Sequence, residues 1–134
     1  MKHTPYLLFD GNCAEALAFY AGLLGGEVTH VMRFKDLAPQ QVVPGDEMKL
    51  GHGRVTGGAF DIMASDAWPG RYHGHEGFSM MTAFADRDEA ETFFRAVSEG
   101  GEILMDFTRT VWSEGFGTCR DRFGVAWMIN TGLE

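Results

Sequence analysis

The chain has 134 residues, 45% of them hydrophobic, with 11 Lys and Arg against 19 Asp and Glu and a formal net charge of -8 at pH 7. This length predicts one domain over residues 1–134, since single cores are usually built from roughly 100–200 residues. The acidic balance argues against nucleic acid or an anionic membrane as a partner, because binding phosphate groups requires a basic face. No apolar run of about 18 residues predicts a membrane helix, and the first residues lack the apolar core of a secretion signal.

The chain has 2 cysteines, Cys13 and Cys119, too few for a disulfide framework. Together with 8 methionines, they predict a cytoplasmic protein with reduced thiols. Cys13 stands at the expected start of a helix, whose dipole would favour a thiolate. No histidine is near it in sequence, so we favour an inert capping or packing role. Cys119 is expected to pack within a strand.

In chain order, the first expected strand is Thr4–Phe9, and a helix containing residues 15–20 follows it. Apolar residues recur at helical spacing through this segment. The pair Gly25-Gly26 ends it, where a glycine can adopt the left-handed C-terminal cap. Three more strands are expected after this helix: Glu27–Phe34, Met48–Val55 and Ala59–Ser65.

The same order of elements recurs in the second half. E-A-x-x-F-Y at residues 15–20 returns as E-A-x-x-F-F at residues 89–94, and the glycine pair returns at residues 100–101. Such self-similarity predicts a duplication, with repeat one at about residues 1–68 and repeat two at about 75–134. The strands expected around the second helix are Gly77–Phe84, Glu102–Phe107, Gly115–Asp121 and Val125–Asn130.

The predicted fold class is α+β, with two βαβββ repeats. One helix covers only one face of a four-stranded sheet, so two such halves can pair their sheets into an open cup that holds a ligand. Repeat one has about ten extra residues between its second and third strands, which fit the segment Lys35–Glu47. Both a lid over the ligand and a tolerated surface insertion explain this segment.

This pattern resembles the vicinal oxygen chelate superfamily, which includes glyoxalase I, extradiol dioxygenases and bleomycin-resistance proteins. Three segments, spanning nearly the whole chain in order, carry the resemblance: TPYLLFDGNCAEALAFYAGLLGGE, DIMASDA and VWSEGFGTCRDRFGVAWMIN. Within the superfamily they are closely similar to PhnB-type proteins, the branch also labelled 3-demethylubiquinone-9 3-methyltransferase-like. The resemblance implies the glyoxalase/bleomycin resistance fold and a homodimer, and it implies no agreed reaction.

Enzymes of the superfamily hold a divalent metal with four side chains, usually His, Gln and Glu, from the first and last strands of each repeat. By the resemblance, these positions fall near Pro5 and Ser79 and on Met63 and Met128. Proline has no donor atom, and two thioethers with a hydroxyl suit a hard or borderline cation poorly. We therefore expect neither a metal nor another cofactor. A slip of one residue brings in only Tyr6, Phe78, Ile62 or Trp127.

Histidines are the remaining candidates for chemistry. His52 lies where PhnB-like sequences also carry His, and with Asp61 it could act as a general base oriented by a carboxylate. A half-exposed histidine or one bonded to backbone is the alternative. His73 and His75, with Glu76, could supply metal ligands if their segment is extended, although mobile surface histidines are ordinary in such a glycine-rich junction.

Methionine and aromatic side chains are expected to line the ligand cup. Trp112 and Phe116 flank the glycines of the penultimate strand, and Met63, Ser79 and Met128 occupy the former metal positions. Thioethers adapt in shape and rings stack, which suits a flat or apolar ligand. Core packing is the alternative, and we favour it for Trp127. Relatives often carry Arg or His near position 115, where this chain has glycine, so no anion contact is expected there.

Two functions stay open, so whether the protein is an enzyme is undecided. The first is the binding of a small organic ligand in a metal-free apolar cup. The second is a metal-independent enzyme that uses His52 as acid or base on a small carbonyl or phosphonate-like substrate. A methyltransferase is the weakest interpretation, because the chain lacks a G-x-G-x-x-G after a strand and the alternating βα pattern of a nucleotide-binding sheet.

Overall fold

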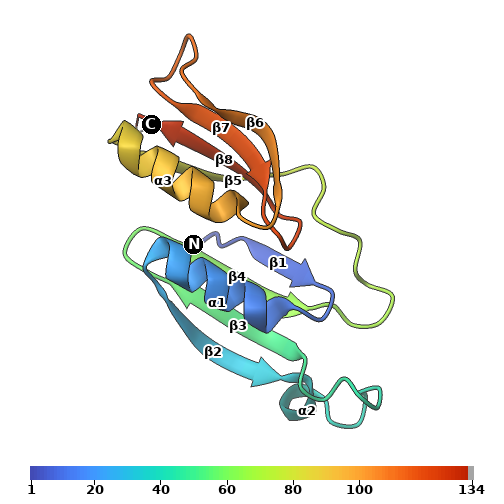
Figure 1. Cartoon of the computed structure of the whole chain (residues 1–134). Coiled ribbons are helices and arrows are strands. Elements are labelled where there is room, and N and C mark those ends of the chain that lie inside the picture. Colours follow the sequence, from blue (N-terminus) through green and yellow to red (C-terminus); the bar gives the residue numbers. More distant parts are fainter. Residues whose placement is uncertain (133–134) are drawn as a thin grey trace. The chain divides into compact units, whose positions relative to one another are not determined.

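The computed structural model describes residues 1–132 and divides into two compact units, Met1–Gly74 and a second that begins at His75. The elements of the first unit are β1 (Tyr6–Phe9), α1 (Cys13–Leu24), β2 (Glu27–Arg33), α2 (Phe34–Leu37), β3 (Leu50–Thr56) and β4 (Asp61–Asp66) (Figure 1). Those of the second unit are β5 (Met80–Phe84), α3 (Arg87–Ser98), β6 (Glu102–Thr108), β7 (Phe116–Arg120) and β8 (Ala126–Thr131). Apart from the short helix α2, each unit has the predicted order βαβββ.

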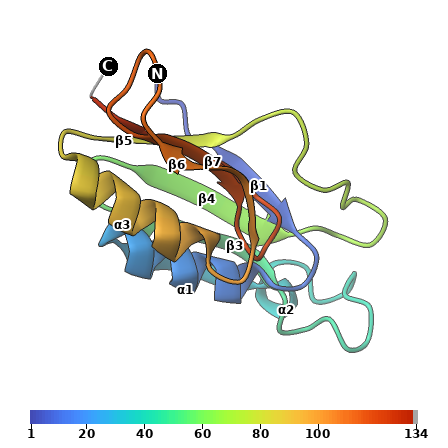
Figure 2. The ribbon, with the colours of Figure 1, turned by 45° about the horizontal axis from the view of Figure 1, so that its top comes forward.

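Each unit forms one mixed four-stranded sheet. The strand orders are β1-β4-β3-β2 and β5-β8-β7-β6. In both sheets the first strand pairs parallel with the last, and the other neighbours pair antiparallel. In each unit the long helix lies along one face of its own sheet (Figure 2). The predicted α+β class and the duplicated βαβββ unit are therefore confirmed.

Helix α3 forms where its sequence is strongly amphipathic. The Asp86 carboxylate caps its start by accepting a hydrogen bond from the backbone N–H of Glu89 at 2.9 Å. Arg87 and Arg95 pair with Glu91, one turn away from each, on the exposed side. The opposite side of the helix buries four apolar residues in the core of the second unit: Ala90, Phe93, Phe94 and Val97.

Each unit also contains one buried aspartate that organises its backbone. Asp66, at the end of β4, accepts hydrogen bonds from the backbone N–H groups of Gly11, Cys13 and Leu50 at 2.9–3.0 Å. It thereby satisfies the start of α1, whose N-cap residue makes no side-chain cap. In the second unit, Asp121 accepts from two backbone N–H groups in the β7–β8 turn and from the indole N–H of Trp127. Within residues 1–132, every helix is too short or too polar to cross a bilayer.

The glycine pairs that follow the two long helices have two separate functions. The first glycine of each pair, Gly25 or Gly100, has a positive φ of 67° or 76°, as expected for the left-handed turn that ends a helix. The second glycine allows close packing. A Cβ on Gly101 would lie 2.1 Å from the carbonyl oxygen of Arg120, and one on Gly26 would lie 2.7 Å from that of Thr56.

The segment Lys35–Glu47 is fastened at its base. The expected strand Glu27–Phe34 ends one residue earlier, because Phe34 begins α2 and its buried ring stacks on Trp68 at 4.1 Å between centroids. The backbone N–H of Phe34 bonds to the carbonyl of Lys49 at 2.8 Å. The backbone N–H of Lys35 bonds to the carbonyl of Glu47 at 3.2 Å, so the insertion is closed where it leaves the sheet.

Candidate functional site

The face of the second sheet opposite α3 carries partly exposed side chains. Residues alternate between the two faces of a strand, so Cys119 and Ile129 are fully buried while Thr118 and Met128 are partly exposed on the other side. Thr118 and Met128 are direct cross-strand partners in the β7–β8 pairing. This arrangement leaves a helix-free face on which a ligand has access to side chains from several strands.

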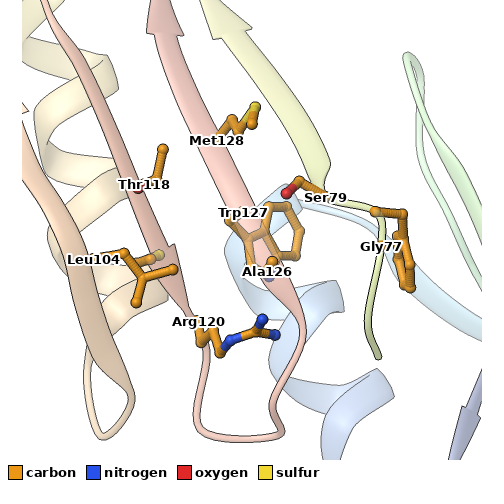
Figure 3. A pocket seen from close by; sticks show the side chains of 10 residues that line it. Gly77, Ser79, Leu104, Thr118, Arg120, Ala126, Trp127 and Met128 are labelled. Carbon is orange, nitrogen blue, oxygen red and sulfur yellow. The ribbon is translucent and has the colours of Figure 1, made fainter. Parts of the chain in front are cut away.

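A cavity of about 520 Å³ lies on this face (Figure 3). A volume of this order is typical of sites for small organic ligands. Its lining combines apolar side chains with the hydroxyls of Ser79 and Thr118 and a single charged group, Arg120. The residues that line it are Gly77, Phe78, Ser79, Leu104, Thr118, Cys119, Arg120, Ala126, Trp127 and Met128.

The Arg120 guanidinium is positioned mainly by backbone carbonyls. Its Nη1 donates to the carbonyl of Gly124 at 3.0 Å and, more weakly, to that of His75 at 3.5 Å. Its Nη2 lies 3.6 Å from a carboxylate oxygen of Glu76, whose side chain is 82% exposed. Across the β7–β8 pairing Arg120 faces Ala126, which offers no side-chain acceptor.

Two of the five residues expected to line the ligand site do line this cavity, namely Ser79 and Met128. Trp112 is 64% exposed and packs edge-on against the ring of Phe116 at 5.5 Å. Phe116 is a cross-strand partner of Asn130, two residues beyond Met128 on the same face, so these aromatic side chains neighbour the cavity lining without joining it. Met63 belongs to the first sheet, where it lies opposite Tyr6.

The structure gives His52 and Asp61 separate partners on the first sheet. Nδ1 of His52 is hydrogen-bonded to the hydroxyl of Tyr6 at 3.0 Å. Both oxygens of Asp61 bind the guanidinium of Arg54, one of them at 2.6 Å, and Nζ of Lys2 lies 2.5 Å from the carboxylate. These two cations hold the pKa of Asp61 well below its usual range. Orientation of His52 is therefore supplied by Tyr6, while Asp61 neutralises Arg54.

The two thiols and His75 lie in low-dielectric surroundings. Burial raises the pKa of the Cys13 thiol strongly, and the nearby Asp66 carboxylate adds to this. Burial likewise raises the pKa of Cys119 to about 11. Burial lowers the pKa of His75, which is only 5% exposed, whereas His73 and Glu76 are exposed. Both thiols are thus protonated at neutral pH, in agreement with the inert role favoured for Cys13.

The residues at the superfamily's metal positions do not fit a divalent metal. Strand pairing sets Met63 against Tyr6 in the first sheet and Met128 against Met81 in the second. Thioethers and a phenol are poor donors for the borderline and hard cations of this superfamily. In residues 1–132, no three His, Cys, Asp or Glu side chains gather into a group that could hold a metal ion.

Arg120 carries no motif that marks it as a binding residue in the sequence. The usable signal was local: Arg120 ends the strand FGTCR and alternates with the buried Cys119, so it shares a face with Thr118. Leu104 and Phe78 were also missed, because exposed apolar residues at a sheet edge and in a connecting segment carry no periodic pattern.

Comparisons with known proteins agree on one family. The model of the Glyoxalase/Bleomycin resistance protein/Dioxygenase superfamily matches residues 2–129. Protein YjdN of Escherichia coli (strain K12) is 32% identical to this chain over 139 residues, which cover 97% of this chain and 95% of YjdN.

Solved structures give the same result. Protein PA1353 from Pseudomonas aeruginosa is 38% identical, with a TM-score of 0.88 over 100% of this chain and 99% of that one. The PhnB protein from Bacillus cereus is 25% identical, with a TM-score of 0.83 over 98% of this chain and 100% of that one. The fosfomycin resistance protein FosX from Listeria monocytogenes has a TM-score of 0.70 at 9% identity over 99% of this chain and 94% of that one, a likeness of fold alone.

Proposed function

Because this chain is a PhnB-like member of the glyoxalase/bleomycin resistance protein/dioxygenase superfamily, we propose that it binds a small organic molecule in the cavity on its second sheet. The observation that carries this proposal is the cavity itself, of about 520 Å³, bordered by Met128 and Leu104 and by the hydroxyls of Ser79 and Thr118. A flexible thioether beside aliphatic and aromatic groups adapts to ligands of different shape. Cys119 is a potential metal ligand in the lining, but burial raises the pKa of its thiol to about 11, and a thiol binds metal as the thiolate, so the proposed binding does not require a metal.

Methionine methyl groups provide a direct test. Protein labelled with 13C at its 8 methionine methyls is screened by NMR against a library of small organic compounds. A ligand in the cavity shifts the methyl resonance of Met128 and leaves that of the exposed Met48 in the first unit in place. A library whose members shift both resonances alike, or neither, contradicts the proposal.

Two neighbouring residues on β6 form a matched pair of variants. Leu104 and Ile103 are both about half exposed, but only Leu104 lines the cavity. Leu104→Asn is expected to weaken binding of an apolar ligand about tenfold, since the apolar contact between this side chain and the ligand is lost. Ile103→Asn changes the same edge strand without touching the cavity, so its affinity stays within about twofold of the wild type.

A metal-independent enzyme is the second candidate, favoured by the hydrogen bond of 3.0 Å between Tyr6 and His52. This bond fixes the ring and makes one imidazole nitrogen available for proton transfer on a small carbonyl or phosphonate-like substrate. His52→Ala tests it. If the variant turns over every candidate substrate as the wild type does while a ligand still binds, this candidate is abandoned.

We also propose that the protein acts as a homodimer. Strand β2 is an edge of the first sheet and exposes Val31 and Met32, so pairing with a second copy would cover apolar side chains and unpaired backbone groups. Light scattering coupled to size-exclusion chromatography measures the mass of the particle in solution. A mass near the 14.8 kDa of one chain contradicts this assembly.

A further inference from the structure

We infer that the molecule bound in this cavity is an organic anion, a small apolar body whose carboxylate or similar oxyanion pairs with Arg120 in place of Glu76. This inference rests on the proposed function, since it names the chemical class of the ligand for the same cavity. Arg120 then recognises the charge of the ligand, and Glu76 is the partner that the ligand displaces.

The guanidinium of Arg120 is fixed in place but incompletely neutralised. Two backbone carbonyls, those of Gly124 and His75, accept hydrogen bonds from its Nη1 and therefore set its position without supplying a full negative charge. Figure 3 shows the side chain extending from β7 toward the start of β8, beside Ala126. An arginine held in this way is already oriented for a ligand, which lowers the entropy cost of binding.

The contact between Arg120 and Glu76 is weak enough to be replaced. At 3.6 Å, the separation of Nη2 from the carboxylate oxygen exceeds the usual length of a charge-assisted hydrogen bond. The Glu76 side chain is 82% exposed, and an exposed ion pair of this kind contributes little free energy. An incoming carboxylate can form a closer, two-pronged contact with the planar guanidinium.

The other lining residues indicate the chemistry of the rest of the ligand, beyond its anionic group. Arg120 is the single charged residue of the ten that line the cavity. The hydroxyls of Ser79 and Thr118 can donate to further oxygens of the ligand, while Leu104 and Met128 provide apolar contact. Since the chain as a whole carries a formal charge of -8, an anion is repelled at long range and needs this local cation to bind.

A matched pair of probes separates charge from shape. The compounds 4-phenylbutanoate and 4-phenylbutanamide have nearly the same size, but only the first is an anion. Isothermal titration calorimetry at low salt is expected to show the carboxylate binding about tenfold more tightly than the amide, because hydrogen bonds to charged groups are the stronger ones. Raising the salt concentration is expected to weaken the binding of the carboxylate and to leave the affinity for the amide unchanged.

Variants of two nearby arginines identify the residue responsible. Arg120→Gln is expected to lower the affinity for the carboxylate to that for the amide. Arg122→Gln removes the same charge two residues away, where the guanidinium lies 4.6 Å from the centre of the Phe123 ring and outside the cavity lining, and it retains the preference. Should Arg120→Gln unfold, Arg120→Lys keeps the charge without the planar fork and is expected to reduce the preference to about threefold.

Glu76→Gln tests the exchangeable partner. Removing the competing carboxylate is expected to tighten the binding of 4-phenylbutanoate about two- to threefold and to leave the amide unchanged. Equal binding of acid and amide by the wild type, or an unchanged preference in Arg120→Gln, overturns the inference while the proposed function stands. Failure of both compounds to bind the wild type contradicts the proposed function and the inference together.

Discussion

The first and second sheets each carry an arginine on the third strand of their unit, and the two arginines have opposite surroundings. Arg54 on β3 is bound by both oxygens of Asp61, a residue of the neighbouring strand. Arg120 on β7 faces Ala126 across the β7–β8 pairing, and within residues 1–132 the carboxylate that pairs with it is that of Glu76, at 3.6 Å. The first sheet therefore neutralises its cation internally, whereas the second leaves its cation available to a ligand.

On the helix side, by contrast, the two units are alike. Each has a buried aspartate that accepts three N–H hydrogen bonds, and each has a glycine pair after its long helix. Both units therefore anchor backbone on a buried aspartate, Asp66 at the end of the fourth strand and Asp121 after the third, and they differ in the charge pairing on the open face of the sheet.

The largest effect is expected from removing the buried aspartates. Asp66→Ala and Asp121→Ala each leave three N–H groups without their acceptor, so each should lower the free energy of unfolding by about 3 kcal/mol or more. Urea denaturation followed by circular dichroism measures this loss. Asp66→Asn and Asp121→Asn, which keep one acceptor oxygen, are the controls and should lose less. A loss below about 1 kcal/mol for either alanine variant would show that the buried aspartate does not stabilise both units alike.

The sequence could predict this shared framework because it depends on pattern. Repeated E-A-x-x-F motifs, glycine pairs and strand-length apolar runs were enough to predict both βαβββ units and their order. The site was less predictable. Ser79 and Met128 line the cavity, and their contact with a ligand stays a prediction; Arg120 and Leu104 were missed because a ligand site depends on which exposed residues of distant segments come together. Asp66 was missed for a similar reason, since its N–H partners are 16 to 55 residues away in the chain, whereas those of Asp121 lie within six residues of it.

The two cysteines provide a second test of the likeness. Burial raises the pKa of both thiols, to about 11 for Cys119, so the thiolate is scarce at pH 7.5. We expect iodoacetamide to alkylate both at least about a hundredfold more slowly than a free cysteine, since each pKa unit is a factor of ten in thiolate. Peptide mass spectrometry reads the two sites separately, with urea-unfolded protein as the control. Rapid labelling of one site alone would show that the core of that unit opens more readily.

One substitution can give Arg120 a close carboxylate on the neighbouring strand, as Arg54 has in the first sheet. Ala126→Asp places a carboxylate directly opposite Arg120, whereas Asp61 in the first sheet lies opposite Thr56 and reaches Arg54 diagonally. The expected result is loss of the roughly tenfold preference for 4-phenylbutanoate over its amide, with the amide still bound. Calorimetry on Ala126→Asn, which has the same size without the charge, is the control. Retention of the preference in Ala126→Asp would mean that the charge of Arg120 does not select the ligand.

The smallest effect concerns pH and the first sheet. Arg54 and Lys2 lower the pKa of Asp61 below its ordinary value of 3.8, so this carboxylate stabilises the folded state wherever it is ionised. The stability difference between wild type and Asp61→Asn should be constant from pH 7 to about pH 5 and shrink as pH falls below the ordinary pKa. Urea denaturation at several pH values measures this difference. A difference that instead grows on acidification would contradict the ion pair.

The second glycine of each pair has a consequence for tracing the ancestry of such proteins. Gly26 and Gly101 lie so close to a carbonyl oxygen of the third strand that any side chain would collide with backbone. Substitutions there are therefore eliminated whatever ligand the protein has come to recognise. In a gene descended from a doubled segment, these two positions should outlast every residue of the binding face and mark where the ancestral copies align.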